Sequence, residues 1–257
     1  MIQPRGPRED VKVYQPDEFA LTETGYRGPA PSWAPGAAAL WVVDAELQGG
    51  RAHQLAPDIL DAEELRRAGS LIAAADRRCY VASHVALRVL LGAWLKIAPA
   101  AVVLRREPCP SCGGPHGRPA TDGGVHFSLS HSRGVALLAF ADVPVGVDVE
   151  LAPQARTVSD IGYQLHPAEI RELAELPEEQ RPAAFVRAWT RKEAYLKGKG
   201  IGLADGLSHD HVGTGPRPQP GPPGWTVTDV AVPAGYAAAV AVRTAGQSPA
   251  RDDDRRK

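Results

Sequence analysis

The sequence predicts an α+β protein made of two halves with a similar layout. Its 257 residues, 44% of them apolar, suffice for one large domain or for two of roughly 100–130 residues. The elements expected before and after residue 143 follow a similar order of strand, helix, long helix and strands, although no repeat is visible residue by residue. The 26 Gly and 24 Pro are somewhat above average in number, and much of this excess lies in a few stretches that break the chain between these elements.

The first half is expected to span residues 37–143, after a mobile leader over residues 1–36 that is rich in Pro, Gly and charge. Acidic residues that follow Asp61 predict a helix start, because the helix dipole favours negative charge there. The expected elements are, in order, a strand at 37–43, a helix from residue 61, a long helix over about 74–95, a loop over 108–124, and strands at 125–129 and 135–140.

The second half is expected to span residues 144–244, before a disordered tail over residues 245–257. Residues 213–224 are so rich in Pro and Gly that they can form neither helix nor strand, which predicts a loop insertion. The other expected elements are a strand at 145–149, helices over about 167–176 and 182–197, and a closing hairpin of strands at 225–232 and 236–242.

Charge and cysteine content exclude several functional classes. The 29 Lys+Arg against 30 Asp+Glu leave no global field that would attract nucleic acid or an anionic membrane. Three cysteines cannot form a fully paired disulfide framework, which favours a reducing compartment. The N-terminus lacks the apolar core of a secretory signal, and polar residues interrupt the most apolar long stretch, residues 81–95. We therefore expect a cytoplasmic protein with neither nucleic acid nor a membrane as partner.

The sharpest local pattern is Gly146-Val-Asp148-Val-Glu150 in an expected strand. Alternate residues of a strand point to the same face, so Asp148 and Glu150 would lie side by side. Two adjacent carboxylates repel unless they share a cation, and ligands that are all oxygen favour Mg²⁺ or Mn²⁺ over zinc. The alternative is the solvent-facing polar side of an edge strand, where alternating acids are common.

A second pattern lies on the expected helix that carries Lys192, Glu193 and Lys197. The apolar stripe of this helix consists of Phe185, Ala188, Trp189 and Leu196. Glu193 stands at the margin of the stripe, so its carboxylate should be partly buried with two lysines close by. The alternative is a solvated helix with an i, i+4 ion pair between Glu193 and Lys197.

The third pattern is Phe127-Ser-Leu-Ser130-His131-Ser132-Arg133. It places short hydroxyl groups and an imidazole at the end of an expected strand, where they could donate hydrogen bonds to an anion. A serine hydrolase is not favoured, because the Gly-x-Ser-x-Gly elbow is missing here. A structural histidine in a turn is the alternative.

These three patterns occur together and in order, and the sequence thereby resembles the Sfp-type 4′-phosphopantetheinyl transferases. The family motifs Phe-Asn-Leu-Ser-His-Ser, Gly-Val-Asp-Val-Glu and Trp-Ser-x-Lys-Glu-Ala-x-x-Lys match residues 127–132, 146–150 and 189–197. Gly117-Arg118-Pro119 is similar to the family's Gly-Lys-Pro. The resemblance implies a pseudo-two-fold pair of α+β halves, each a small sheet packed on a long helix, with coenzyme A bound in the cleft between them.

The resemblance also implies a reaction. Such enzymes transfer 4′-phosphopantetheine from coenzyme A to a serine of an apo acyl or peptidyl carrier protein and release adenosine 3′,5′-bisphosphate. By this resemblance Asp148, Glu150 and Glu193 would hold Mg²⁺, or Mn²⁺, at the pyrophosphate. Glu193 would also take the serine proton, and Asp148 and Lys197 would be the other catalytic residues. A monomer is implied, whereas the carrier protein stays open among polyketide, nonribosomal peptide and fatty-acid systems.

The same resemblance assigns contacts to the substrate. Lys192 and Lys197 would steady phosphate charge, Ser130 and His131 would contact the 3′-phosphate of the nucleotide, and Gly117 with Arg118 would lie by the adenine.

The sequence departs from the family at two of these places. Arg118 stands where the family usually has Lys, which keeps the charge but changes the shape of the donor. Cys79 stands where relatives often place an Arg, so Arg78 and Arg67 are the candidates for that phosphate contact. One residue along a helix changes the direction of a side chain by about 100°, so Arg78 need not reach the same point.

Two other functional classes stay open. A non-catalytic module on the same fold would bind coenzyme A or a carrier protein without needing three acids around a cation. A Mg²⁺-dependent phosphohydrolase would release phosphate without a protein acceptor.

One further motif lies outside these patterns. Cys109-Pro-Ser-Cys112-Gly-Gly resembles half of a zinc knuckle, and His116 lies nearby in the sequence. Zinc normally takes four ligands, and the chain has no second pair of cysteines. The sequence therefore favours a reduced pair in a loop over a metal site or a disulfide.

Overall fold

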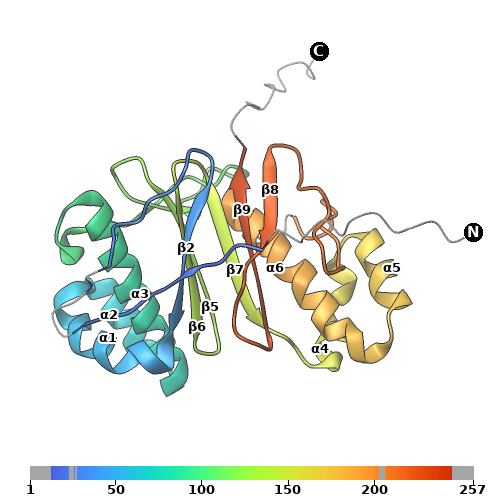
Figure 1. Ribbon diagram of the computed structural model, residues 1–257, viewed down its shortest axis with the longest axis horizontal. Helices are drawn as coiled ribbons and strands as arrows, with labels where there is room; N and C mark the ends of the chain where they lie inside the picture. The colour runs from blue at the N-terminus through green and yellow to red at the C-terminus, as the bar shows by residue number, and fades with distance from the viewer. Residues whose placement is uncertain (1–12, 23–25, 27, 203–205, 245–257) are drawn as a thin grey trace, which may run out of the picture.

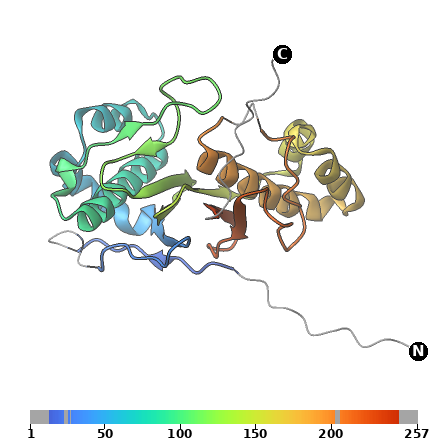
Figure 2. The same cartoon turned by 90° about the horizontal axis from the view of Figure 1, so that it is seen from above.

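The computed structural model describes residues 13–22, 26, 28–202 and 206–244, except the side chain of Ser159. It confirms the α+β class. Two small sheets lie side by side at the centre, and helices cover the outer side of each (Figure 1). Seen from above, the helices of the first half and those of the second lie at opposite ends of the molecule (Figure 2). Within the described ranges, no helix is long and apolar enough to span a membrane.

The first half contains a four-stranded sheet in the order β1-β2-β6-β5. Its strands are β1 (Asp17–Glu18), β2 (Ala38–Asp44), β5 (His126–Ser132) and β6 (Val135–Ala141). Its helices are α1 (Ala45–Ile59), α2 (Ala62–Ser70) and α3 (Ala74–Leu95). A 3-10 helix (Pro99–Ala101) and a two-stranded ribbon of β3 (Arg105–Arg106) and β4 (Pro119–Ala120) connect α3 to β5.

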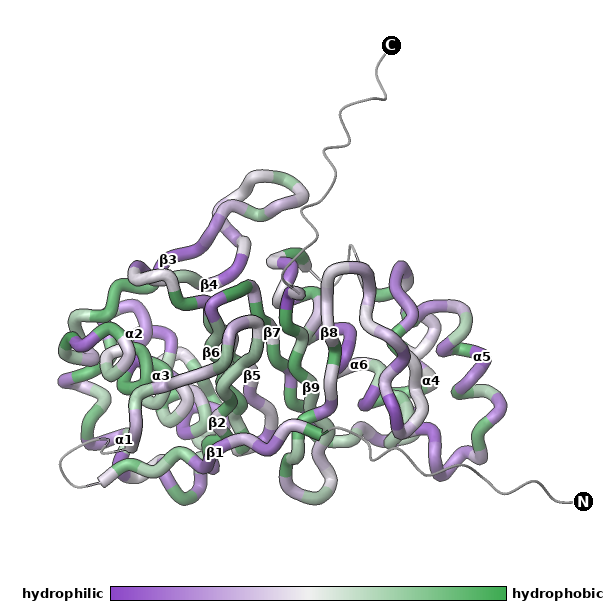
Figure 3. The backbone as a smooth tube through the Cα atoms, turned by 45° about the horizontal axis from the view of Figure 1, so that its top comes forward, coloured by the Kyte–Doolittle hydropathy of each residue, from purple (hydrophilic) through white to green (hydrophobic). Residues whose placement is uncertain are grey.

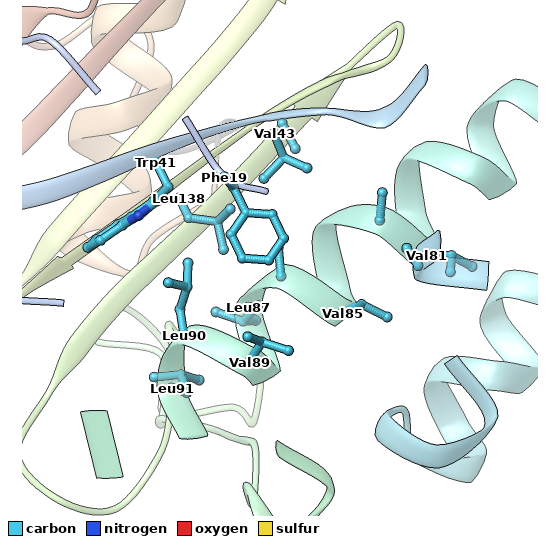
Figure 4. Close-up of a cluster of buried hydrophobic side chains, with 14 of the residues drawn as sticks. Phe19, Trp41, Val43, Val81, Val85, Leu87, Val89, Leu90, Leu91 and Leu138 are labelled. Carbon is cyan, nitrogen blue, oxygen red and sulfur yellow. The ribbon is translucent and has the colours of Figure 1, made fainter. Parts of the chain in front are cut away.

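Local chemistry explains where the helices of this half begin. Asp61 caps α2 in a reciprocal capping box with Glu64, as the acidic start predicted. The long helix α3 covers the expected range and buries its apolar residues against β2 and β6 (Figure 4). Helix α1 was not expected, because Gly49 and Pro57 within it are typical of loops.

The segment expected to be a mobile leader is packed over part of its length. Strand β1 pairs in parallel with β2, and Phe19 is 3% exposed between β2 and α3 (Figure 4). Tyr14 forms a bridge to Val230 of the second half. Over residues 13–22, burial of apolar side chains therefore outweighs the loop-like composition of this segment. Residues 1–12 and the expected tail over residues 245–257 lie outside the described residues.

The second half contains a three-stranded sheet in the order β7-β9-β8, with helices on its outer side. Its strands are β7 (Val145–Leu151), β8 (Trp225–Asp229) and β9 (Tyr236–Arg243). Its helices are α4 (Ala155–Ile161), α5 (Pro167–Glu175) and α6 (Arg181–Lys199), with 3-10 helices at Gly162–Gln164 and Glu178–Gln180. Helix α4 was not expected, whereas residues 213–224 form the predicted loop without helix or strand.

A seam between β5 and β7 joins the two halves. On β5, every second residue is a serine whose hydroxyl reaches β7. Ser128 Oγ accepts from the Val147 N–H at 3.1 Å, and Ser132 Oγ donates to Glu150 Oε2 at 2.7 Å. Next to this seam, the apolar strands of both sheets share one core, visible as neighbouring hydrophobic segments in Figure 3.

Candidate active site

Asp148 is the central residue of the site. It lies on β7 and is 1% exposed. Its Oδ1 accepts hydrogen bonds from Ser130 Oγ at 2.7 Å and from Lys197 Nζ at 2.6 Å. Its Oδ2 is buried and has no hydrogen-bond partner among the described residues. A buried, unpartnered carboxylate oxygen costs free energy, so this oxygen is suited to bind a cation or a donor.

Two more carboxylates lie close to Asp148. Glu150 follows it on the same face of β7, and burial raises the pKa of Glu150. Glu193 projects from α6, where burial and then the charge of Asp148 raise its pKa to about 7. The positive charge of Lys197 acts in the opposite direction on both glutamates. The three acids predicted from two separate motifs therefore share one electrostatic environment, and Lys197 is part of it.

Two glycines allow α6 to lie directly on β7. A Cβ at Gly146 would be 2.0 Å from the carbonyl oxygen of Ala194 and 2.4 Å from the backbone nitrogen of Gly198. A Cβ at Gly198 would be 2.6 Å from the Trp225 ring. This close approach brings the two functional side chains of α6 over Asp148. The sequence analysis did not recognise these glycines as positioning residues, although Gly146 opens the acidic motif.

Lys192 does not join the carboxylates. Its side chain is 2% exposed, its Nζ lies 2.9 Å from Glu169 Oε2, and it donates to the backbone carbonyl of Asp210. Glu169 lies on α5 and also accepts from the N–H groups of Val212 and Gly213. The expectation that Lys192 steadies phosphate charge is therefore not supported. Its buried ion pair instead ties α6 to α5 and to the loop after α6.

A cavity of about 640 Å³ opens between the two halves, and Lys197 lies in its wall. Gly117 and Arg118, which the family resemblance places by the adenine, line the same cavity. The Arg118 guanidinium donates to Glu107 Oε2 and, at 2.9 Å, to the carbonyl of Gly198 on α6. Arg118 thus links the β3–β4 hairpin of the first half to the helix that carries Glu193.

Of the remaining residues that were predicted to contact the substrate, one lies in the carboxylate network and three lie away from it. Ser130 is 7% exposed and lies inside the carboxylate network rather than at the cavity wall. His131 lies on the other face of β5, where burial of part of its ring and then the positive charge of Lys197 lower its pKa. Arg67 is exposed on α2, and Arg78 donates to Glu46 on α1. Neither arginine is among the described residues that line the cavity.

Tyr80 and His84 were missed by the sequence analysis. Their rings stack with centroids 3.8 Å apart, and both line the cavity. Burial lowers the pKa of His84 to about 4, so its ring is neutral near pH 7. His84 Nδ1 lies 2.9 Å from the Tyr80 carbonyl, which can only accept, so Nδ1 carries the proton and Nε2 is an acceptor. The sequence could have indicated this pair, because side chains at positions i and i+4 of a helix lie next to each other.

Comparison with known proteins decides the family. A model of the 4′-phosphopantetheinyl transferase superfamily matches residues 144–224. Over 215 residues the chain is 31% identical to the 4′-phosphopantetheinyl transferase HetI of Nostoc sp. (strain PCC 7120), an alignment that covers 82% of this chain and 89% of HetI. The chain belongs to the 4′-phosphopantetheinyl transferase superfamily.

Other members of the superfamily match shorter parts of this transferase. The 4′-phosphopantetheinyl transferase psf-1 of Bacillus pumilus is 36% identical over 84 residues, which cover 32% of this chain and 35% of psf-1. The 4′-phosphopantetheinyl transferase AcpT of Salmonella typhimurium is 38% identical over 138 residues, or 51% of this chain and 65% of AcpT. The recognition based on three ordered motifs is confirmed, and the relatives support transferase activity.

The carboxylates of this transferase fit a hard divalent cation. All the donors are oxygen atoms, and the buried Oδ2 of Asp148 has no partner among the described residues. The oxygens of Asp148, Glu150 and Glu193 do not all lie within 4.8 Å of one another among the described residues. For the three carboxylates to bind one ion together, their side chains would have to shift.

Proposed function

We propose that this chain transfers the 4′-phosphopantetheine group of coenzyme A to a serine hydroxyl of an apo acyl or peptidyl carrier protein and releases adenosine 3′,5′-bisphosphate. The observation that carries the proposal is the buried cluster of Asp148 and Glu193, linked through Lys197 to a cavity of about 640 Å³. That volume is typical of cofactor sites. Both walls of the cavity belong to one chain, so a monomer suffices.

Asp148, Glu150 and Glu193 would hold the metal ion, and their all-oxygen donor set favours Mg²⁺ or Mn²⁺. When bound, the ion would neutralise negative charge on the pyrophosphate as that linkage breaks. The unpartnered Oδ2 of Asp148 supports this assignment, because it offers a buried anionic ligand that no described side chain satisfies.

Glu193 takes the proton of the carrier serine. Without metal, burial and the charge of Asp148 raise the pKa of this group to about 7, and a bound cation would lower that pKa and keep the group as carboxylate, the form that accepts a proton. The serine oxygen forms a bond to the pantetheine-side phosphorus, and the bond from that phosphorus to the bridging oxygen breaks. Adenosine 3′,5′-bisphosphate leaves with the bridging oxygen, while Lys197 and Arg118 provide positive charge at the cavity wall.

Intact-mass spectrometry of apo carrier proteins tests the proposal. With coenzyme A and Mg²⁺, at least one member of a panel of carrier proteins should gain the mass of phosphopantetheine. Asp148→Ala should lower the rate at least about 100-fold, because several kcal/mol of charge stabilisation are lost. Asp58→Ala, at an exposed position of α1, should leave the rate unchanged.

Two outcomes would contradict the proposal. One is a panel that stays unmodified while a control transferase modifies it. The other is tight binding of coenzyme A that does not depend on Mg²⁺ and leads to no transfer, which would indicate the non-catalytic binding module.

The three cysteines are all unpaired, which supports a reducing compartment, the cytoplasm, as the place where the protein works. The assays therefore belong in reducing buffer.

A further inference from the structure

The hairpin between β3 and β4 carries three potential metal ligands that the proposed transfer does not use. Cys109 is buried, whereas Cys112 and His116 are exposed. The sequence favoured a simple reduced cysteine pair, because the motif supplies only half of a zinc knuckle. The structure adds His116 to the pair, since the chain turns back after Cys112.

The three ligand atoms converge on one point. Sγ of Cys109, Sγ of Cys112 and one ring nitrogen of His116 all lie within 4.8 Å of one another. Cys112 Sγ is 3.0 Å from His116 Nε2. Tetrahedral zinc, with bonds of about 2.3 Å to sulfur and 2.0 Å to nitrogen, places such atoms about 3.5–3.8 Å apart. Small rotations of exposed side chains therefore suffice to bind an ion.

The backbone around Cys109 is already folded for a metal-bound thiolate. The Cys109 N–H donates to the Gly114 carbonyl at 2.7 Å, and the Gly113 N–H donates to the Cys109 carbonyl at 2.8 Å. Gly113 has a φ of 73°, a conformation that favours glycine. The Gly114 N–H donates to the sulfur of Cys112 at 3.4 Å. Such N–H groups stabilise a thiolate, which is the form that binds zinc.

We propose that Cys109, Cys112 and His116 form a binding site for one Zn²⁺ ion, with water as the fourth ligand. Two thiolates and an imidazole are soft and borderline ligands, which select zinc over Mg²⁺. The ion replaces the protons of the two thiols, which are released to solvent. Because Cys112 and His116 are exposed, the fourth position is open to water. This site is separate from the carboxylates of Asp148 and Glu193.

Zinc at this site would stiffen the wall of the cavity. His116 itself lines the cavity, and Gly117 and Arg118 follow it directly. The Gly117 N–H donates to the Glu107 carbonyl at 2.9 Å, and a Cβ at Gly117 would lie 2.5 Å from that oxygen. The turn that holds the three ligands is therefore followed directly by tightly packed backbone and by the arginine that bonds to α6.

Metal analysis of the full chain tests the site. The protein is purified in reducing buffer without added chelator, and its zinc content is measured by elemental mass spectrometry. We expect about one zinc ion per chain. After removal of the metal with a chelator, titration with Co²⁺ should produce thiolate-to-cobalt charge-transfer absorption that saturates at one equivalent and disappears on addition of Zn²⁺.

Matched variants assign the ligands. Cys112→Ser and His116→Ala should each weaken Co²⁺ binding at least about tenfold, with unchanged circular dichroism. Cys79→Ala on α3 and His53→Ala on α1 remove a cysteine and a histidine elsewhere and should bind normally. Substoichiometric zinc together with no charge-transfer band would overturn the proposal, as would equal loss in the control variants. These readouts do not depend on coenzyme A or on transfer, so they stand apart from the proposed function.

Discussion

At the scale of single residues, the site holds negative charge that the fold would be more stable without. Glu193 shows this most clearly, because burial and Asp148 raise its pKa from 4.5 to about 7. Between pH 4.5 and about pH 7, Glu193 is ionised in the unfolded chain and protonated in the folded chain. Without metal, the free energy of unfolding therefore falls as the pH rises through this window, and above it the whole penalty is present.

Replacement of Glu193 by Gln should separate stability from activity. In EDTA at about pH 8, Glu193→Gln should raise the free energy of unfolding by about 2–3 kcal/mol, with a smaller gain near pH 5. Turnover should fall at least about 100-fold, since the base is lost. Urea unfolding at both pH values and the intact-mass assay measure these effects. Glu175→Gln, at an exposed position of α5, is the control. A variant less stable than wild type at pH 8 would contradict the buried charge.

Lys192 and Lys197 lie on one helix but have different environments. Lys192→Met should lower the free energy of unfolding by about 3–5 kcal/mol, because Glu169 is left buried without its cation. Lys197→Met should lower turnover as well as the free energy of unfolding, because its half-buried side chain lies in the cavity wall and is the cation beside the buried Asp148. Urea unfolding and the transfer assay separate the two effects.

A double variant provides the control for this comparison. Lys192→Met with Glu169→Gln should recover part of the lost stability, because no uncompensated charge remains between α5 and α6. If Lys192→Met instead kept full stability and lost transfer, Lys192 would have the phosphate role that the family resemblance implied.

At the scale of elements, strong boundary signals made the helices predictable. The start of α2 at Asp61 and the length of α3 followed from capping and periodicity. Helix α1 could not be predicted in the same way, because Gly49, Gly50 and Pro57 oppose it locally and its packing on α3 stabilises it. Phe19 likewise orders a segment that composition alone assigns to a mobile leader.

The candidate site was predictable in its acids and less so in its bases. Alternation on β7 identified Asp148 and Glu150, and the margin of an apolar stripe identified Glu193. The direction of Lys192 could not be predicted, because it depends on which face of α6 rests on β7. That face is fixed by the contact of Gly146 with the backbone of α6, which exists only in three dimensions.

Gly146→Ala tests how this contact positions the site. A Cβ 2.0 Å from the Ala194 carbonyl would push α6 away from β7, because backbone cannot rotate aside. We expect a loss of about 1–3 kcal/mol in the free energy of unfolding and a fall in kcat as Glu193 moves away from Asp148. Gly50→Ala is the matched control, since a Cβ there meets nothing within 4 Å. Unchanged kcat in a folded Gly146→Ala protein would contradict the positioning role.

At the scale of the whole molecule, buried side chains join the two halves. The strands of both sheets share one apolar core, and the serines of β5 provide partners for β7. The two halves are therefore joined mainly by buried side chains and not by backbone hydrogen bonds between paired strands. A transferase built in this way cannot open its cavity by separating the halves without exposing that core.

The shared core predicts that both halves unfold in one transition. Hydrogen exchange measured separately in α3 and α6 against urea should give coincident midpoints. Val147 is fully buried in the shared core, so Val147→Ala should lower both midpoints together, as the free energy of unfolding falls by about 2 kcal/mol. Val103→Ala, at a side chain that is 66% exposed, should leave both unchanged. Separate midpoints, or a shift confined to α6, would show instead that the halves are independent units and that the cavity between them can open as a hinge.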